Sequence, residues 1–226
     1  MSVCLMLHGL GPPPPRIPAV EVPYWLSTET FSKIVELARN TKAHITIDDG
    51  NASDIQIALP VLQAAGLSAT FFIPSGRIGQ PDYVSEGDIR TLHVAGMEIG
   101  SHGCEHLRWT EVSDKEIEHD VTRSLARLET ILGEKIQTVA VPYGDCDRRV
   151  LRVLRRLGVR RVYTSFRGPV SERAWLVRRE CITSDMTMAS IRTMLEKKHT
   201  AAETLMAFLR AWKHAGRAVL WSADEN

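Results

Sequence analysis

The chain has 226 residues, 44% of them hydrophobic and 24% charged, with a formal net charge of +1. This length and composition are typical of a soluble globular protein with a large core, and we expect one domain over residues 1–226. A net charge near zero gives no general attraction to nucleic acid or to an anionic membrane. We therefore expect no nucleic-acid partner.

The spacing of the cysteines and the residues at the N-terminus indicate in which cellular compartment the protein is expected. Cys4, Cys104, Cys146 and Cys181 form no Cys-x-x-Cys pair, which predicts free thiols in a reducing compartment. Residues 1–8 lack a basic region, and their apolar stretch is too short for a signal peptide. No apolar run approaches the roughly 20 residues that span a bilayer. The expectation is a cytoplasmic protein without a membrane span.

Short apolar runs alternate with amphipathic stretches along the chain. An extended loop with four consecutive prolines, at residues 11–18, follows the first run. Capping boxes at Ser85–Asp88 and Ser113–Glu116 mark helix starts, and glycines mark helix ends. The predicted strands are 3–7, 43–47, 69–73, 97–99, 139–141 and 162–164, and the predicted helices are 28–37, 54–65, 85–95, 113–132 and 148–157. The alternation continues less clearly around 176–177, 190–197, 201–214 and 218–221.

Strands that alternate with helices predict about seven or eight parallel βαβ units. No Gly-x-Gly-x-x-Gly follows the first strand and no Walker A sequence is present, which disfavours a nucleotide-binding sheet. We expect an α/β fold, namely a distorted or incomplete (β/α) barrel. In such barrels the active site lies at the C-terminal ends of the strands.

Two polar segments follow predicted strands and so belong at that end of the barrel. They are Thr46-Ile-Asp48-Asp49-Gly50 and Ser101-His102-Gly-Cys-Glu-His106. Two imidazoles and one carboxylate are the donors of a 2-His-1-carboxylate metal site, and a second carboxylate remains beside it. That combination is typical of metal-assisted hydrolysis.

The stretch 45–164 resembles the polysaccharide deacetylase family, also called carbohydrate esterase family four. The family motif Thr-Phe-Asp-Asp-Gly corresponds to residues 46–50, and His-Ser/Thr-x-x-His corresponds to residues 102–106. The motif Arg-x-Pro-Tyr-Gly corresponds to Ala-Val-Pro-Tyr-Gly at residues 140–144. Segments 66–73 and 95–101 are similar as well.

The resemblance implies a hydrolase that removes acetyl groups from an N-acetylated sugar or glycan by cutting the amide bond. It implies that Asp49, His102 and His106 bind a divalent metal, with zinc as the first expectation. Asp48 would be the general base on the metal-bound water. The metal and the backbone N–H of Tyr143 would hold the oxyanion.

Two further residues are expected near the substrate. Pro142 belongs to the third motif, and Trp109, three residues past His106, is the tryptophan we expect to stack on a sugar. For the other tryptophans, core packing is the default expectation.

Three positions depart from the family pattern. Ala140 stands where the family often has an arginine that orients the base, and Arg178 or Arg179 could replace it. Residues 220–222 read Leu-Trp-Ser where the family has Leu-x-His, so the histidine that supplies a general acid is missing. Gly103 replaces the usual hydroxyl residue between the histidines.

These departures leave alternatives open. The protein could be an impaired metal-binding barrel that binds a glycan or a partner protein, an O-acetyl esterase, or a hydrolase of a non-sugar amide. His8-Gly-Leu-Gly11 looks like the oxyanion loop of α/β-hydrolases, but no Gly-x-Ser-x-Gly nucleophile accompanies it. For His8, a plain loop position is favoured over a place at the active-site mouth. The seven arginines of residues 148–161 indicate a solvated helix face rather than a site for anions.

Overall fold

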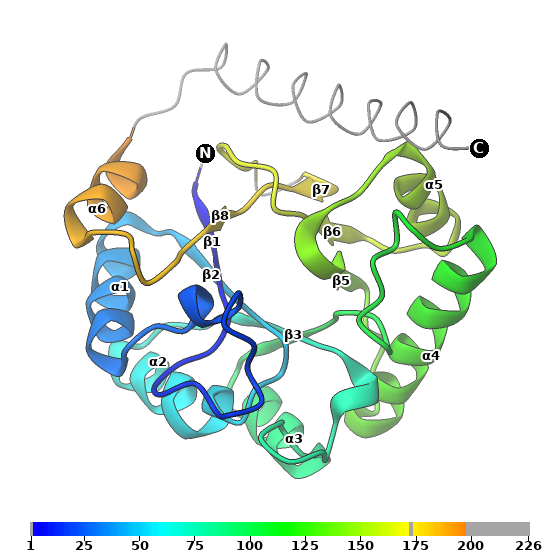
Figure 1. Ribbon diagram of the computed structural model, residues 1–226, viewed down its shortest axis with the longest axis horizontal. Helices are drawn as coiled ribbons and strands as arrows, with labels where there is room; N and C mark the ends of the chain where they lie inside the picture. The colour runs from blue at the N-terminus through cyan, green and yellow to red at the C-terminus, as the bar shows by residue number, and fades with distance from the viewer. Residues whose placement is uncertain (1, 172–173, 198–226) are drawn as a thin grey trace.

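Eight parallel strands form one curled sheet, with helices around its outside (Figure 1). The computed structural model describes residues 2–171 and 174–197. The strand order is β7-β6-β5-β4-β3-β2-β1-β8. The elements in chain order are β1 (Cys4–Leu7), α1 (Thr28–Thr41), β2 (His44–Asp48), α2 (Leu59–Ala65), β3 (Thr70–Ile73), α3 (Glu86–Val94), β4 (Glu98–Ser101), α4 (Asp114–Leu132), β5 (Thr138–Ala140), α5 (Arg148–Arg156), β6 (Arg161–Tyr163), β7 (Leu176–Val177), β8 (Glu180–Cys181) and α6 (Met188–Glu196).

The capping signals place the helix boundaries where the sequence predicts them. The Ser113 hydroxyl accepts from the Glu116 backbone N–H, and the Glu116 carboxylate accepts from the Ser113 backbone N–H, so α4 begins with a full capping box. Gly133 ends α4 with a left-handed φ of 73°. One difference concerns the predicted helix 54–65, whose first turn, Asp54–Ala58, is a π-helix. Such bulges are frequent at functional sites.

The main core lies between the sheet and the helices. Phe31 and Ile34 of α1 pack in one cluster with Leu5 of β1 and Ile47 of β2, and all four are fully buried. Burying each such side chain contributes about 1.5–3 kcal/mol. Inside the barrel the Phe72 ring occupies the space beside Gly100, where a side chain would overlap with it.

The sheet nearly closes on itself. β7 and β8 are its two edges, yet only Arg178 and Arg179 separate them in the chain. A two-residue link spans at most about 10 Å, so the edges must lie close together. The chain crosses this seam without a helix, which confirms a distorted, incomplete (β/α) barrel. β8 was not predicted, because two residues are too short to show a periodicity.

Two further expectations can be compared with the structure, and a third falls on residues that it does not describe. All four cysteines are free thiols, as predicted. Within residues 2–171 and 174–197, no helix has the length and apolar character needed to cross a membrane. The predicted segments 201–214 and 218–221 and the Leu-Trp-Ser stretch at 220–222 lie outside the described residues.

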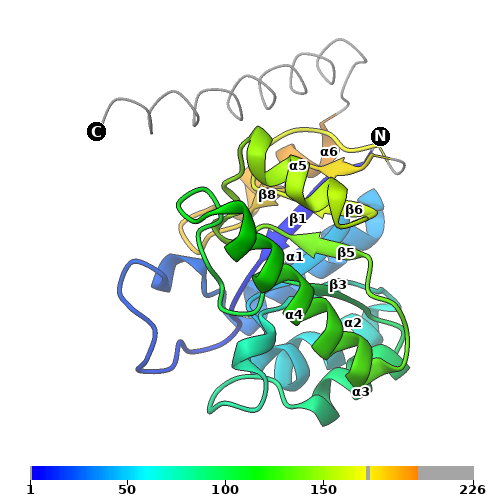
Figure 2. The same ribbon diagram turned by 90° about the vertical axis from the view of Figure 1, so that its right-hand side faces the viewer.

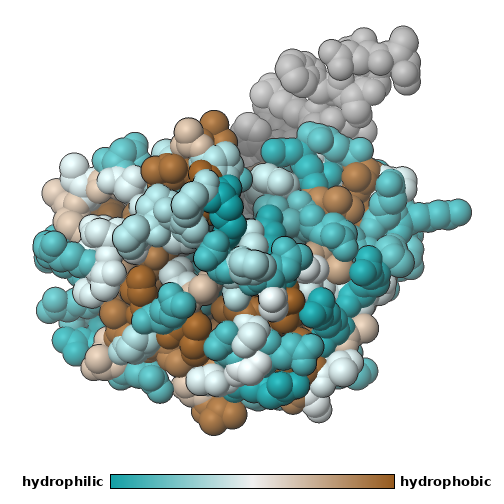
Figure 3. Space-filling model, turned by 60° about the horizontal axis from the view of Figure 1, so that its bottom comes forward, coloured by the Kyte–Doolittle hydropathy of each residue, from teal (hydrophilic) through white to brown (hydrophobic). Residues whose placement is uncertain are grey.

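The face shown in Figure 3 mixes hydrophobic patches with hydrophilic side chains.

Candidate active site

A pocket of about 360 Å³ lies at the C-terminal ends of the strands. In the side view, the strands run towards the projecting loop that follows β1 (Figure 2). The predicted base and all three predicted metal ligands line this pocket. Its walls are Met6 and His8 from β1 and its end, Glu21, Tyr24 and Trp25 from the following loop, Asp48, Asp49, Arg77, His102, His106, Arg108, Tyr143, Gly144, Ser165 and Cys181.

The three predicted ligands converge on one point. The Oδ1 atom of Asp49 lies 3.2 Å from Nε2 of His106 and 3.9 Å from Nε2 of His102. One donor atom from each residue can be chosen so that all three lie within 4.8 Å of one another. Two imidazoles and one carboxylate at this spacing fit a divalent metal such as zinc. The sequence prediction of this cluster is therefore supported by the geometry.

His102 is held in the tautomer that a metal needs. Its Nδ1 lies 2.9 Å from the backbone oxygen of Ala140, which can only accept a hydrogen bond, so Nδ1 carries the proton. Nε2, which faces the carboxylates, then keeps its lone pair free. A backbone carbonyl behind a ligating histidine is the usual way to fix its orientation. Burial lowers the pKa of His102, and the negative charge of Asp48 raises it by a smaller amount. The resulting pKa is about 4, so the ring stays neutral at pH 7.

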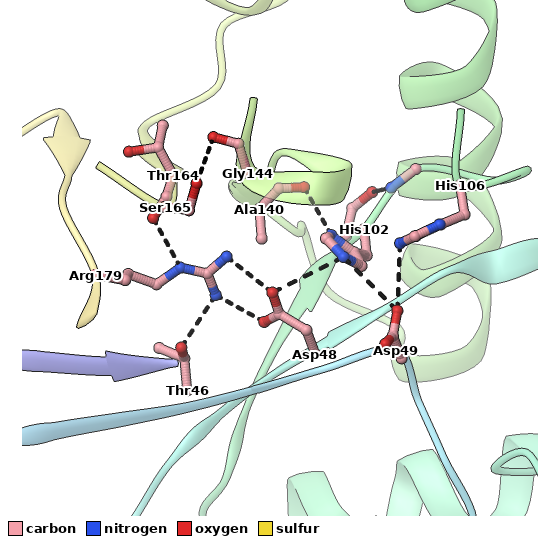
Figure 4. Close-up of polar contacts among 12 residues, drawn as sticks. Thr46, Asp48, Asp49, His102, His106, Ala140, Gly144, Thr164, Ser165 and Arg179 are labelled. Atoms are coloured by element: carbon pink, nitrogen blue, oxygen red, sulfur yellow. Dashed lines mark hydrogen bonds and ion pairs between the residues drawn. The ribbon is translucent and has the colours of Figure 1, made fainter. Parts of the chain in front are cut away.

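The sequence left the partner of Asp48 open between Arg178 and Arg179, and the structure selects Arg179 (Figure 4). Nη1 and Nη2 of Arg179 donate to Oδ1 and Oδ2 of Asp48 over 2.7 and 2.8 Å. The same guanidinium donates to the Thr46 hydroxyl and the Thr164 carbonyl. Arg178 instead donates to the Pro169 carbonyl. Of the two candidate arginines, Arg179 is therefore the one that contacts Asp48, and position 140 is an alanine.

Both aspartates are kept ionised. Burial by itself raises the pKa of Asp48, but the charge of Arg179, with help from His102, holds that pKa below its usual range. Burial also opposes ionisation of Asp49, and there the hydrogen bond from His106 and the charge of His8 lower the pKa. A deprotonated Asp48 is what a general base requires.

Backbone strain is concentrated in the pocket. Asp49, His106 and Tyr143 have φ values of 82°, 54° and 60°. They are three of the five non-glycine residues with positive φ in the described part of the chain. Such conformations cost about 1–3 kcal/mol each and persist where the surroundings impose them, often at functional sites.

The loop that carries the histidines is organised by Asp120 of α4, a residue that sequence reasoning missed. Its buried carboxylate accepts from the backbone N–H of Cys104 and Glu105 and from Nε1 of Trp109, over 2.8 to 3.0 Å. At Gly103 a side chain would overlap with this carboxylate, and φ is 72°. This explains why a glycine replaces the usual hydroxyl residue there.

Trp109 corrects the prediction of a sugar-stacking residue. Its side chain is fully buried, and it packs in the core with Ile117 and Val121 of α4. Its position three residues after a ligand did not reveal that the loop folds back onto α4. Trp25 lines the pocket instead.

The third motif contributes its tyrosine but not its proline. Pro142 is buried and is not part of the pocket wall, so the prediction that it contacts the substrate is wrong for this side chain. Tyr143 is 52% exposed, and its ring lies 4.7 Å from the ring of His106 and 4.2 Å from the Arg108 guanidinium. The motif thus builds a strained turn that presents Tyr143 at the rim.

His8 lies in the pocket, against the favoured expectation of a plain loop residue. Its ring meets the Tyr24 ring edge-on at 5.0 Å. Nδ1 is buried and has no hydrogen-bond partner among the described residues. The signal that could have found His8 is its place directly after β1, whose Leu7 pairs with Ile47 of β2. His8 therefore ends its strand beside the aspartates.

The arginines of residues 148–161 do not belong to the pocket as far as the chain is described. Arg149 instead donates to the backbone oxygens of Trp109 and Val112, and Arg155 lies over the Trp175 ring. The interpretation of this segment as a solvated helix face stays a prediction, while Arg149 and Arg155 contact groups of the protein itself.

Known proteins with similar sequences or folds can now be compared. YxkH of Bacillus subtilis (strain 168) is 24% identical over 127 residues, which cover 56% of this chain and 46% of that protein. Chitin deacetylase 1 of Cryptococcus neoformans is 26% identical over 135 residues, 59% of this chain and 28% of that protein. The matched part thus spans less than half the length of either relative.

The fold is similar to that of the deacetylase PplD of Streptococcus pyogenes, whose structure was solved in complex with acetate. The TM-score is 0.76 at 16% identity, and the match covers 87% of this chain and 98% of PplD. At the level of sequence, a model of the family described as polysaccharide deacetylase matches residues 38–162, the stretch that contains Asp48, Asp49, His102, His106 and Tyr143. This chain therefore belongs to the polysaccharide deacetylase family.

Proposed function

We propose that the protein is a metal-dependent hydrolase that removes the acetyl group from an N-acetylated sugar or glycan. The observation that carries this proposal is the pairing of two units in one pocket, the Asp49–His102–His106 cluster and the arginine-held Asp48 beside it. Membership of the polysaccharide deacetylase family supports the same reaction. One of the similar proteins is named a chitin deacetylase, which supports an N-acetylated sugar as the substrate class.

The pocket suits a small polar ring with an apolar face. Its volume of about 360 Å³ lies within the usual range for small-molecule sites. Trp25 and Tyr143 are aromatic side chains of its walls, and aromatic rings are the side chains on which sugar rings stack.

The metal cluster, Asp48, Arg179 and Tyr143 each have a role in the proposed reaction. A divalent ion bound by Asp49, His102 and His106 would polarise the acetyl carbonyl and make a water more acidic. Asp48 takes a proton from that water as the water attacks the carbonyl carbon. Arg179 keeps the Asp48 carboxylate ionised and oriented. The backbone N–H of Tyr143, on its strained turn, is our candidate donor to the negatively charged oxygen that develops.

Residues 220–222 read Leu-Trp-Ser and so lack the histidine that donates a proton in the family motif. His8 is our candidate for this proton donor. When the carbon–nitrogen bond breaks, the sugar nitrogen must take up a proton to leave as an amine. His8 lies in the pocket, and its positive charge contributes to lowering the pKa of both Asp48 and Asp49. A protonated imidazole there can deliver the proton and become neutral, while Asp48 holds the proton from water.

The proposal is tested by acetate release from a panel of N-acetyl and O-acetyl sugars and oligosaccharides. Wild-type protein loaded with zinc is compared with chelator-treated protein and with Asp48→Asn, after each has been assayed for bound metal. We expect release by the wild type alone, with Asp48→Asn still holding zinc. Release from O-acetyl sugars alone would favour an esterase. Zinc-loaded protein that releases no acetate would favour the impaired, ligand-binding barrel.

A further inference from the structure

The two adjacent aspartates of the pocket have arginine partners of different kinds. Asp48 forms two short hydrogen bonds with Arg179, and neither side chain is more than 2% exposed. Asp49 has a single contact with Arg77, 3.3 Å between Nη1 and Oδ1, and these side chains are 21% and 30% exposed. The first pair is fixed in the interior. The second lies at the pocket wall, where a guanidinium can turn towards water.

The fold places Arg77 beside the metal ligands. Arg77 ends the 3₁₀ turn Ser75–Arg77 that follows β3. The backbone N–H groups of Ser75 and Gly76 donate to the oxygens of Gly103 and Cys104, over 3.0 and 2.9 Å. A side chain at Gly76 would come within 2.6 Å of the Cys104 oxygen, so the turn must approach this closely. The turn with Arg77 is therefore bonded directly to the loop between the two histidines.

Arg77 contacts the same oxygen that faces the imidazoles. Oδ1 of Asp49 is 3.3 Å from Arg77 Nη1 and 3.2 Å from His106 Nε2. A divalent cation bound by the three ligands would use this carboxylate and would meet the guanidinium charge within a few ångströms. Like charges at that separation repel each other even in partly exposed surroundings.

We propose that Arg77 is a counter-cation of Asp49 that a divalent metal must displace, and that it thereby sets the metal affinity of this site. The inference rests on the metal centre of the proposed function. Arg77 neutralises Asp49 when no metal is bound and keeps its carboxylate next to His106. The Arg77 guanidinium is 30% exposed and can turn towards water; its Cζ also lies 5.3 Å from the centre of the Tyr83 ring, which the Arg16 guanidinium already covers at 4.0 Å.

The test is a zinc titration of chelator-stripped protein by calorimetry with a competing chelator, at low ionic strength. We expect Arg77→Gln to bind zinc about tenfold more tightly than wild type, because one repelling charge is gone. Arg77→Lys, which keeps the charge, should stay close to wild type. Arg123→Gln is the matched control. It removes an arginine that lies 3.4 Å from Glu105, a residue of the same loop that is not a ligand, and zinc affinity should not change.

A second readout is the unfolding midpoint. Stripped Arg77→Gln should unfold at a lower temperature than stripped wild type, and its midpoint should rise more when zinc is added. If Arg77→Gln binds zinc like wild type or more weakly, Arg77 does not compete with the metal and the inference is overturned, while the metal centre stands. If neither wild type nor any variant binds zinc, the metal centre of the proposed function is itself overturned.

Discussion

Arg179 and Asp48 are joined by two parallel hydrogen bonds of 2.7 and 2.8 Å, although 131 positions separate them in the chain. Arg179 lies in the two-residue link that crosses the barrel seam between β7 and β8, and Asp48 ends β2. The closure of the barrel and the orientation of the proposed base thus depend on the same short link.

Breaking this pair is expected to destabilise the fold. Arg179→Met leaves the Asp48 carboxylate buried and unpaired, which costs about 3–5 kcal/mol. The pKa of Asp48 is below its usual range in the folded protein, so its stabilising contribution is present above about pH 4 and lost as the pH falls further. The deficit of Arg179→Met should therefore be smaller at pH 3 than at pH 7, as measured by urea unfolding.

The double variant Asp48→Asn/Arg179→Met is the control for this prediction. It removes both charges, so it should recover much of the stability lost in Arg179→Met. Equal stability of Arg179→Met and wild type at pH 7 would show that the pair has no structural role.

His8 can be tested through the leaving group. His8→Gln should lower hydrolysis of an N-acetyl sugar about 100-fold or more, because the amine can no longer be protonated as it leaves. Hydrolysis of an aryl acetate should change only a few-fold, since a phenolate leaves without a proton. Initial rates on both substrates measure this contrast, and Asp48→Asn should lower both. A His8→Gln variant that loses both activities equally, or neither, contradicts the proposed role.

Asp120 should control metal binding without touching the metal. Asp120→Ala releases two backbone N–H groups of the loop between His102 and His106. We expect zinc affinity to fall about 10- to 100-fold, as is common when a group that orients ligands is lost. Calorimetric titration measures this. Trp109→Phe removes the indole N–H and part of a buried ring but leaves both backbone hydrogen bonds of Asp120, so it should have a much smaller effect on zinc affinity. Wild-type zinc affinity in folded Asp120→Ala would contradict the prediction.

The buried carboxyl group of Asp54 should give the protein an unusual dependence of folding stability on pH. Both carboxylate oxygens are buried without a hydrogen-bond partner among the described residues. Burial, followed by the charges of Asp49 and Asp48, raises the pKa of Asp54 well above its usual value. Its contribution to stability is therefore fully present below about pH 4 and lost as the pH rises towards the folded-state pKa.

Asp54→Asn should then stabilise the protein at pH 8, by about 1.4 kcal/mol or more, since each pKa unit corresponds to that amount. The gain should disappear at pH 3.5, where Asp54 is protonated in both the folded and the unfolded chain. Thermal unfolding at the two pH values measures it, with the exposed Asp185→Asn as control. A loss of stability at pH 8 would show that the ionised carboxylate is needed.

The fold was largely predictable because its signals are local. Alternating apolar runs and capping boxes such as Ser113–Glu116 depend on neighbours a few residues away, and they located most of the strands and helices. The metal ligands were predictable for a related reason. Asp49 and His102 directly follow strands, and parallel strands bring their C-terminal ends to one edge.

Only the tertiary structure decided the contacts between segments that are distant in the chain. Whether Arg178 or Arg179 faces Asp48 depends on how the link turns as it crosses the seam, and no periodicity encodes that turn. The buried indole of Trp109 donates a hydrogen bond to Asp120 on α4. His8 lies in the pocket because β1, which it follows, pairs with β2. The sequence by itself thus determined which chemical groups stand at the strand ends. The closing of the barrel decided which of them meet, because a hydrogen bond depends on distance in space rather than along the chain.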